Sequence, residues 1–356
     1  MVSLLKKKKS DGVSVRHLQI PRLGVGARRN RLNQQPTDRA RRSPKKPLLP
    51  PPRSSAHRRR PMDKFHDRQY VWLRSRVHGK YLHANIDGKS VSLHRRRAAL
   101  RAAWAVHIHQ GDAPEPYLLL YNAANGRYLA ATATRAPPGH IGFRAEQRDY
   151  DQPQLQAVMW LAAETGFRDD VLLRNAGGRY LRANGKYTGK YLRLKNVTVD
   201  GINNVSTMMY WTVEPIPLRD PNSPLGLAPP TLGRRPRELP DMLGRERGVR
   251  RLIRFVRASA EGGFAEDGWS EFHFTGRSVY ELRNELYSRI GPHRHPHPDI
   301  LPFDIVMCVR AGRYGRLIPL VVNLPHGRNG ETLQIVLCLS RTPAYGRLRY
   351  PDVHAE

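Results

Sequence analysis

The chain has 356 residues and a formal net charge of +31, with 61 Lys and Arg against 30 Asp and Glu. This length allows two or three domains, and such a charge favours an acidic partner or surface without indicating a fold. With only two cysteines, the chain cannot have a framework of several disulfides. No apolar run approaches the ~18 residues of a transmembrane helix. We therefore expect a protein of the cytoplasm, the nucleus or both.

Residues 1–61 form a basic, proline-rich segment with roughly 18 Lys and Arg and 2 acidic residues. The segment has no aromatic residue, so it cannot bury enough apolar surface to offset its ordering entropy, and we predict that it is disordered. Its basic runs are of the nuclear-localisation or nucleic-acid-binding kind, although a solvated tail is the plainer interpretation. These runs are Lys6 to Lys9, Arg41 to Lys46 and Arg58 to Arg60.

A motif of Gly, a cation, Tyr and Leu occurs three times between residues 62 and 216. It begins at Gly79, Gly126 and Gly178, so the spacings are 126 − 79 = 47 and 178 − 126 = 52 residues. Each copy has a leucine shortly before it and a tryptophan after it, and we expect these repeated apolar residues to form a core. They are Leu73, Tyr81, Leu82, Trp104, Leu120, Tyr128, Leu129, Trp160, Leu173, Tyr180, Leu181 and Trp211.

Turn signals accompany the motif. Asn125-Gly126 and Gly177-Gly178 are typical of two-residue β-hairpin turns. Apolar residues alternate before each turn, which predicts a strand, and a second pair of strands should lead to each tryptophan. Three four-stranded units with a period near 50 residues predict a β-trefoil over residues 62–216.

Charged positions repeat with the motif. Lys80, Arg127 and Arg179 directly follow the three turn glycines, so they would form a basic ring or protect strand edges. The first copy adds Arg95, Arg96, Arg97 and Arg101, for which a solvated loop is the plainer interpretation. All seven are candidate contacts for an anion or a protein partner. A sugar-binding trefoil is disfavoured, because no glutamine stands two residues before any of the three tryptophans.

Residues 217–247 are rich in proline and predict a linker, and residues 248–342 predict a second domain. Apolar runs and one amphipathic helix give the order β-β-α-β-β-β, which is typical of a small α+β ubiquitin-like roll. Ser278 and Glu281 form a capping box at the start of that helix. Residues 343–356 are expected to be a C-terminal tail.

The first repeat resembles the fascin-like, actin-cross-linking β-trefoil superfamily. The features that carry this resemblance are Leu73-Arg74-Ser75, the motif itself, Ala84 and Trp104. With the C-terminal segment included, residues 62–356 resemble a plant family of unassigned function (domain of unknown function five-six-nine). In that family a trefoil is followed by a second small domain. The resemblance implies the fold and, by distant analogy to fascin, filamentous actin as a partner.

No catalytic motif is found, so we expect no enzymatic activity and no cofactor. His293, His295 and His297 lack an obvious fourth ligand, and we expect no metal. The first functional hypothesis is a non-catalytic binding or scaffold protein, with filamentous actin as the partner. The alternative is an anion-directed adaptor that binds nucleic acid or acidic membrane through the basic tail and Arg95–Arg97.

Overall fold

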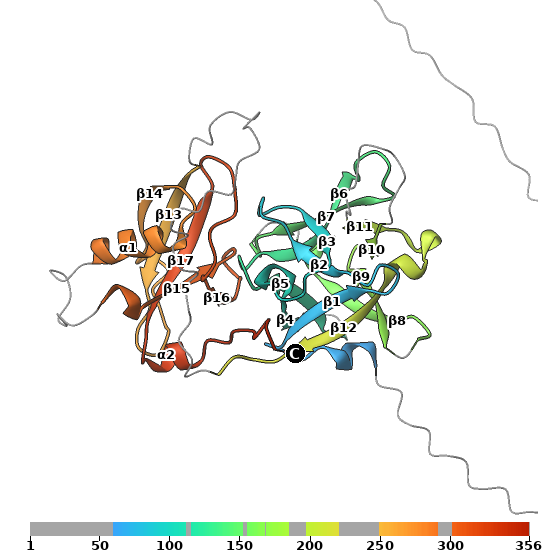
Figure 1. The fold of residues 1–356 in the computed structure, drawn as a ribbon, viewed down its shortest axis with the longest axis horizontal. Helices are drawn as coiled ribbons and strands as arrows, with labels where there is room; N and C mark the ends of the chain where they lie inside the picture. The colour runs from blue at the N-terminus through green and yellow to red at the C-terminus, as the bar shows by residue number, and fades with distance from the viewer. Residues whose placement is uncertain are drawn as a thin grey trace, which may run out of the picture. The chain divides into compact units, whose positions relative to one another are not determined.

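The computed structural model describes residues 60–111, 115–151, 155–167, 169–184, 197–220, 249–290 and 301–355. Within these ranges the chain is mostly β and forms a twelve-stranded and a five-stranded sheet (Figure 1). The predicted basic tail lies outside the described residues up to position 59, and so do the histidines at 293–297.

The twelve strands of the first sheet fall into three four-stranded units that follow one another along the chain. Short 3₁₀ helices precede the last strand of each unit, and one more precedes the first strand. The strands are β1 (Tyr70–Ser75), β2 (Tyr81–Ala84), β3 (Val91–His94), β4 (Trp104–His109), β5 (Tyr117–Asn122), β6 (Tyr128–Arg135), β7 (Phe143–Arg148), β8 (Trp160–Glu164), β9 (Asp170–Asn175), β10 (Tyr180–Ala183), β11 (Val197–Asp200) and β12 (Tyr210–Ile216). The 3₁₀ helices are η1 (Pro61–Lys64), η2 (Leu100–Ala102), η3 (Leu155–Ala157), η4 (Ile202–Asn204) and η5 (Thr207–Met209).

The pairing of these strands closes a barrel. The first and last strands of each unit pair with each other, as β1–β4, β5–β8 and β9–β12. Pairs between units, β4–β5, β8–β9 and β1–β12, complete the ring. The remaining strands form the hairpins β2–β3, β6–β7 and β10–β11. This arrangement confirms the predicted β-trefoil.

Each repeat is linked to its own tryptophan by the same hydrogen bond. The indole Nε1–H of Trp104 donates to the main-chain oxygen of Leu82 at 3.1 Å, within the first repeat. Trp160 donates to Leu129 at 2.9 Å, and Trp211 donates to Leu181 at 3.0 Å. All three tryptophans are fully buried, so each ring fills the core while its polar atom is satisfied.

The turns of the motif differ from the prediction. The two-residue hairpin turns are wrong, because β5 ends at Asn122 and β6 begins only at Tyr128. The amide of Gly126 donates to the main-chain oxygen of Asn122 at 2.8 Å, and Gly126 has a φ of +72°. Glycine therefore serves a longer turn that requires the left-handed conformation. The Asn122 side chain also receives the Ala124 amide and donates to Ala103, which explains a fully buried amide.

The second sheet has the strand order β14-β13-β17-β15-β16, and β13 and β17 are parallel. The helix α1 packs on one face of this sheet (Figure 1), where its buried residues Val279, Leu282 and Leu286 join the sheet core. The Ser278 hydroxyl accepts from the Glu281 amide at 3.2 Å, as the predicted cap requires. The elements are β13 (Arg250–Arg257), β14 (Ser270–Thr275), α1 (Val279–Ile290), η7 (Pro302–Asp304), β15 (Ile305–Arg310), β16 (Leu317–Pro319), β17 (Thr332–Leu339) and α2 (Pro343–Gly346). The predicted ubiquitin-like roll is confirmed.

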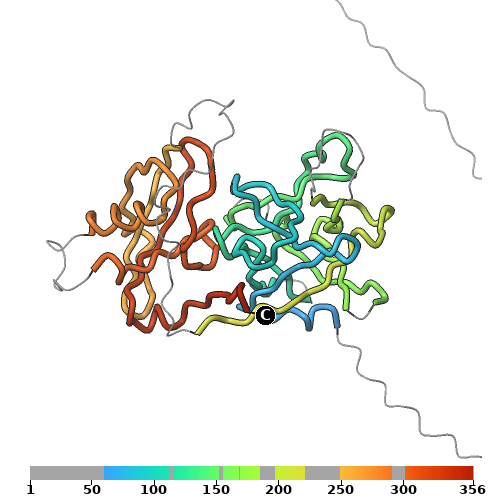
Figure 2. The backbone as a smooth tube through the Cα atoms, in the orientation of Figure 1, coloured from blue at the N-terminus to red at the C-terminus, as the bar shows by residue number. Residues whose placement is uncertain are grey.

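The final segment differs from the expected tail. Figure 2 shows it in dark red, running back along the segment that follows β12. Leu218 and Pro351 form a β-bridge, and the Arg219 amide donates to the main-chain oxygen of Tyr350 at 2.9 Å. Val353 is buried among residues of the trefoil. Residues 343–355 are therefore part of the folded unit.

Candidate functional site

The motif cations join neighbouring repeats. The Arg127 guanidinium donates to the main-chain oxygen of Gly88, in the preceding repeat, at 2.6 Å. Arg179 donates in the same way to Thr132 at 2.8 Å, and its guanidinium lies 3.8 Å from the centre of the Phe143 ring. Lys80 is half-buried and also has interaction partners. Arg127 and Arg179 therefore hold neighbouring repeats together, and both guanidinium groups have acceptors within the chain.

The second copy of the motif has a further role, because it docks the ubiquitin-like domain. A Cβ placed on Gly126 would lie 3.2 Å from methyl groups of both Ile318 and Val309. The Tyr128 hydroxyl accepts the amide of Arg316 at 3.1 Å. Val309 and Ile318 belong to the same buried cluster as Tyr128, so the motif lies in a shared apolar core.

A histidine completes the hydrogen bonds of Tyr128. Nδ1 of His107 lies 3.1 Å from the Tyr128 hydroxyl, which accepts from Arg316 and so has its own proton to donate. Burial, and then the charge of Arg316, lower the pKa of His107 to about 4, which leaves this nitrogen free to accept at neutral pH.

Arg127 forms an ionic link across the same contact. Its Nε lies 3.3 Å from Oδ1 of Asp149, and its Nη2 is paired with Glu331 of the ubiquitin-like domain. Burial raises the pKa of Asp149, and Arg127 opposes this shift. Glu331 also pairs with the buried Arg251 at 3.5 Å. Such a half-buried network depends on every member, because a lone buried charge is costly.

Main-chain contacts strengthen the docking. The Tyr150 amide donates to the oxygen of Ala311 at 2.9 Å, and the Tyr314 amide donates to the oxygen of Tyr150 at 3.3 Å. Between them, Gly312 has a φ of +89°, and a Cβ there would lie 2.6 Å from the Tyr150 amide nitrogen. The trefoil and the ubiquitin-like domain are thus joined by a close backbone approach.

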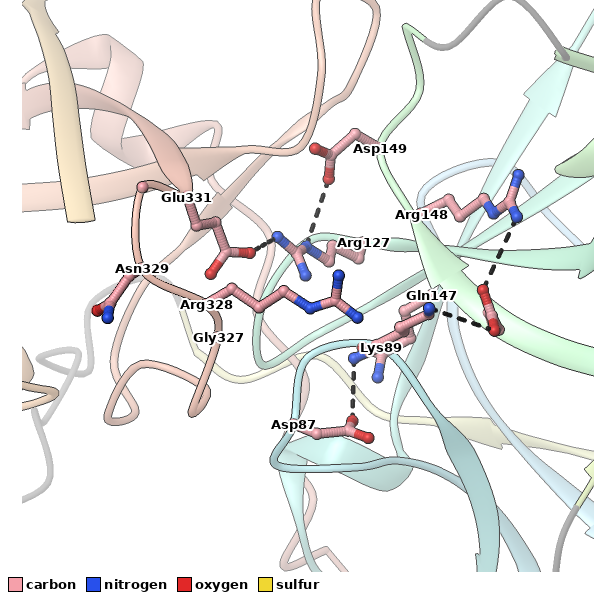
Figure 3. A pocket seen from close by; sticks show the side chains of 12 residues that line it. Asp87, Lys89, Arg127, Gln147, Arg148, Asp149, Gly327, Arg328, Asn329 and Glu331 are labelled. Carbon is pink, nitrogen blue, oxygen red and sulfur yellow. Dashed lines mark hydrogen bonds and ion pairs between the residues drawn. The ribbon is translucent and has the colours of Figure 1, made fainter. Parts of the chain in front are cut away.

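A charged groove of about 550 Å³ lies beside this contact (Figure 3). It is bounded by the end of β7, the turn at Asp87 and the loop from Gly327 to Glu331. Lys89 and Arg148 both pair with Glu146, at 3.7 and 3.8 Å, so most charges of the groove neutralise one another. Figure 3 shows the Arg328 side chain extending into the groove, and it makes no ion pair with any described residue.

The lining of the groove consists of carboxylates, amides, cations and glycines. Its carboxylates Asp149 and Glu331 are engaged by Arg127. We therefore regard the groove as the border of the domain contact.

The arginine run of the first repeat is arranged differently from the motif cations. Arg95, Arg96 and Arg97 are exposed between β3 and η2, and none forms an ion pair with a described carboxylate. The indole of Trp72 donates to the main-chain oxygen of Arg97 at 3.0 Å, and the Arg97 guanidinium lies 5.1 Å from the Trp72 ring centre. The loop is anchored at Arg97, so the charges before it are presented to solvent. Arg101 follows in η2 and is half-buried.

The twelve residues expected in the trefoil core are all buried, except for Tyr81, which is half-buried. The residues that sequence reasoning missed are the docking residues of the second domain, such as Glu331 and Arg316. One available signal was the apolar run Ile305 to Val309, which indicates a strand covered on both faces. In the described ranges, no helix has the length and apolar character needed to cross a membrane.

Several solved structures are similar to less than half of this chain. A Caenorhabditis elegans protein of unknown function has 16% identity and a TM-score of 0.35, with 42% of this chain and 96% of that chain covered. The SDF2-like protein from Arabidopsis thaliana has 14% identity and a TM-score of 0.36, with 42% and 93% covered. SeviL, solved with the asialo-GM1 saccharide, has 14% identity and a TM-score of 0.30, with 41% and 96% covered. At these scores the likeness carries no conclusion about function.

Family comparison is more specific. No curated protein matches the chain. Residues 62–213 match the Beta-trefoil domain of unknown function (DUF569), and residues 249–338 match the DUF569 associated ubiquitin-like domain. Together with the observed trefoil and ubiquitin-like roll, these matches show that the chain belongs to the DUF569 family.

Proposed function

We propose that the chain is a non-catalytic binding protein that engages an acidic protein surface through Arg95 and Arg96 of the first trefoil repeat. The observation that supports this most is the contrast among the arginines. Arg127 and Arg179 are held by internal acceptors, whereas Arg95 and Arg96 are exposed and unpaired within the described residues. Exposed arginines held on an anchored loop are well suited to carboxylates, which the guanidinium binds through paired hydrogen bonds.

A protein partner suits this surface better than single-stranded nucleic acid. Single-stranded binding uses exposed aromatic rings on which bases stack. The aromatic ring at the arginine run, Trp72, is 3% exposed and lies against Arg97. The fascin-like resemblance of the trefoil nominates filamentous actin as the first partner to test. We propose the cytoplasm or the nucleus as the compartment, since two buried free cysteines are compatible with a reducing environment.

Co-sedimentation with filamentous actin tests the proposal. We expect residues 62–356 to pellet saturably near physiological salt, and Arg95→Ala/Arg96→Ala to bind about tenfold more weakly, because two partner contacts are lost. The matched control is Arg174→Ala/Arg328→Ala, which removes two other exposed arginines that are unpaired in the described chain. It should bind like the wild type.

Two results would contradict the proposal. Equal weakening in both double variants would mean that only net charge matters. Pelleting by the full chain alone, lost steeply with salt, would instead favour polyelectrolyte attraction by the basic tail, as expected for a nucleic-acid or membrane adaptor.

A further inference from the structure

The charged groove of Figure 3 has the size of a ligand site. Its volume of about 550 Å³ lies within the ~300–1,000 Å³ of most small-molecule sites. Its walls come from both domains. The turn at Asp87 and the end of β7 belong to the trefoil, whereas the loop from Gly327 to Glu331 belongs to the ubiquitin-like domain. A ligand bound in the groove would therefore contact both domains.

The four carboxylates that line the groove already have partners within the chain. Oδ1 of Asp87 accepts the amides of Lys89 and Ser90, each at 2.9 Å. Oδ2 of Asp87 accepts the Ser90 hydroxyl at 2.6 Å. The other three carboxylates are held in ion pairs by neighbouring cations, so the lining is a poor site for a cationic ligand. These three are Glu146, Asp149 and Glu331.

The cations at the groove outnumber these carboxylates by one. Arg251, which pairs with Glu331 at 3.5 Å, joins the four cations of the lining, so five positive groups face four negative ones. The excess lies at Arg328, which is exposed and whose side chain has no ion pair or hydrogen bond with another described residue. Figure 3 shows this side chain reaching from its loop into the groove. The cations of the lining are Lys89, Arg127, Arg148 and Arg328.

The loop that carries Arg328 is fixed at both ends. Before it, the His326 amide donates to the main-chain oxygen of Ile86 at 2.7 Å. After it, the Gly330 amide donates to the main-chain oxygen of Arg250 at 3.0 Å. The guanidinium is thus presented from an anchored loop, and this lowers the entropy cost of holding a ligand.

Lys89 adds a second donor on the trefoil wall of the groove. Its Nζ lies 3.7 Å from Oε1 of Glu146, which is too far for a hydrogen bond, and its side chain is 51% exposed. The ammonium group therefore keeps its N–H bonds for a ligand. An excess of one positive charge suits a monoanion, because a dianionic phosphoryl group would place a further negative charge beside the carboxylates of the groove.

We propose that the groove binds a ligand with a single carboxylate group, which Arg328 and Lys89 hold between the two domains. The planar guanidinium group matches the two oxygens of a carboxylate. The volume of the groove leaves room for a larger body behind that group. A free organic acid and the C-terminus of a peptide would both present it. This site is separate from the exposed Arg95 and Arg96.

Isothermal titration calorimetry on the full chain tests the site. The probes are N-acetylalanine and acetyl-tetra-alanine with a free C-terminal carboxylate, and the matching C-terminal amides are the uncharged controls. The acids should bind at least about tenfold more tightly than the amides, because only they form charge-assisted hydrogen bonds. Binding of both acids would support the proposal with a small acid as sufficient, and binding of the peptide acid alone would support it with a peptide C-terminus as the source. Binding of neither acid, or equal binding of acids and amides, would overturn it.

Substitution separates the groove from general charge attraction. Arg328→Gln should weaken binding of the acids at least about tenfold, whereas Arg174→Gln, which removes an exposed arginine outside the groove, should weaken it less than about threefold. Because the Arg328 side chain is exposed and unpaired in the described chain, Arg328→Gln should leave the unfolding temperature unchanged. Equal losses of binding in the two variants would overturn the proposal. Tighter binding of glycerol 3-phosphate than of either acid would also overturn it, because the groove would then prefer a dianion.

Discussion

Replacement of Gly312 by alanine is expected to lower the free energy of unfolding by about 3 kcal/mol or more. A positive φ costs an alanine roughly 1–2 kcal/mol, and overpacking adds roughly 1–3 kcal/mol. The added Cβ would lie 2.6 Å from the amide nitrogen of Tyr150 and 2.9 Å from that of Asp151. Since these neighbours are backbone atoms, they cannot give way by a side-chain rotation. Urea unfolding followed by circular dichroism measures the loss.

The chain offers a matched control for this prediction. Gly139 has a φ of +82°, close to the +89° of Gly312, but a Cβ on it would have no neighbour within 4 Å. Gly139→Ala should therefore lower the free energy of unfolding by about 1–2 kcal/mol, which is the cost of a positive φ for alanine. If both variants lost the same free energy of unfolding, the close approach of Gly312 to the trefoil backbone would not contribute to stability.

The other large effect is expected at Trp160. Trp160→Ala should cost about 3–5 kcal/mol, because it empties a fully buried site. Trp160→Phe keeps much of the apolar volume but leaves the main-chain oxygen of Leu129 without its 2.9 Å donor, and this should cost about 1–3 kcal/mol. Denaturant unfolding of the two variants gives both values.

Trp269 provides the comparison for Trp160→Phe. It lies in the ubiquitin-like domain, is half-buried and packs beside Arg310. Trp269→Phe should cost less than Trp160→Phe, because its surroundings are open to water. If Trp160→Phe left the free energy of unfolding unchanged, the hydrogen bond of the indole would contribute little to stability. The tryptophans would then stabilise the trefoil only by filling its core.

The trefoil could be predicted from the sequence because its three-fold symmetry appears there as a motif that occurs three times. Trp104, Trp160 and Trp211 each bond to the leucine of their own motif, so the repeated residues are those that the geometry needs three times. The helix α1 was predictable for a similar reason. Its capping residue Ser278 and its apolar stripe lie close together in the sequence, so they indicate a helix without knowledge of the rest of the fold. Such local and periodic signals survive in a single sequence.

The specialisation of the second motif was not predictable, because the three copies are nearly identical in sequence. Lys80, Arg127 and Arg179 occupy the same place in the motif, yet Arg127 alone of the three pairs with Glu331, about two hundred residues away. Pairing of this kind depends on which face of the barrel the next domain covers. The two-residue turns were mispredicted because Asn125-Gly126 also suits a longer turn, whose length is set by the buried Asn122.

The second repeat of the trefoil docks the ubiquitin-like domain through its motif residues Gly126, Arg127 and Tyr128. The most direct measurement compares three equivalent substitutions, Gly79→Ala, Gly126→Ala and Gly178→Ala, by urea unfolding of the full chain. All three glycines have a positive φ, so the backbone cost is shared. A Cβ on Gly126 would also press on Ile318 and Val309 at 3.2 Å, whereas Gly178 has no neighbour within 4 Å. Gly126→Ala should therefore lose about 1 kcal/mol more than either of the others. Equal losses at the three positions would contradict the docking role of the second repeat.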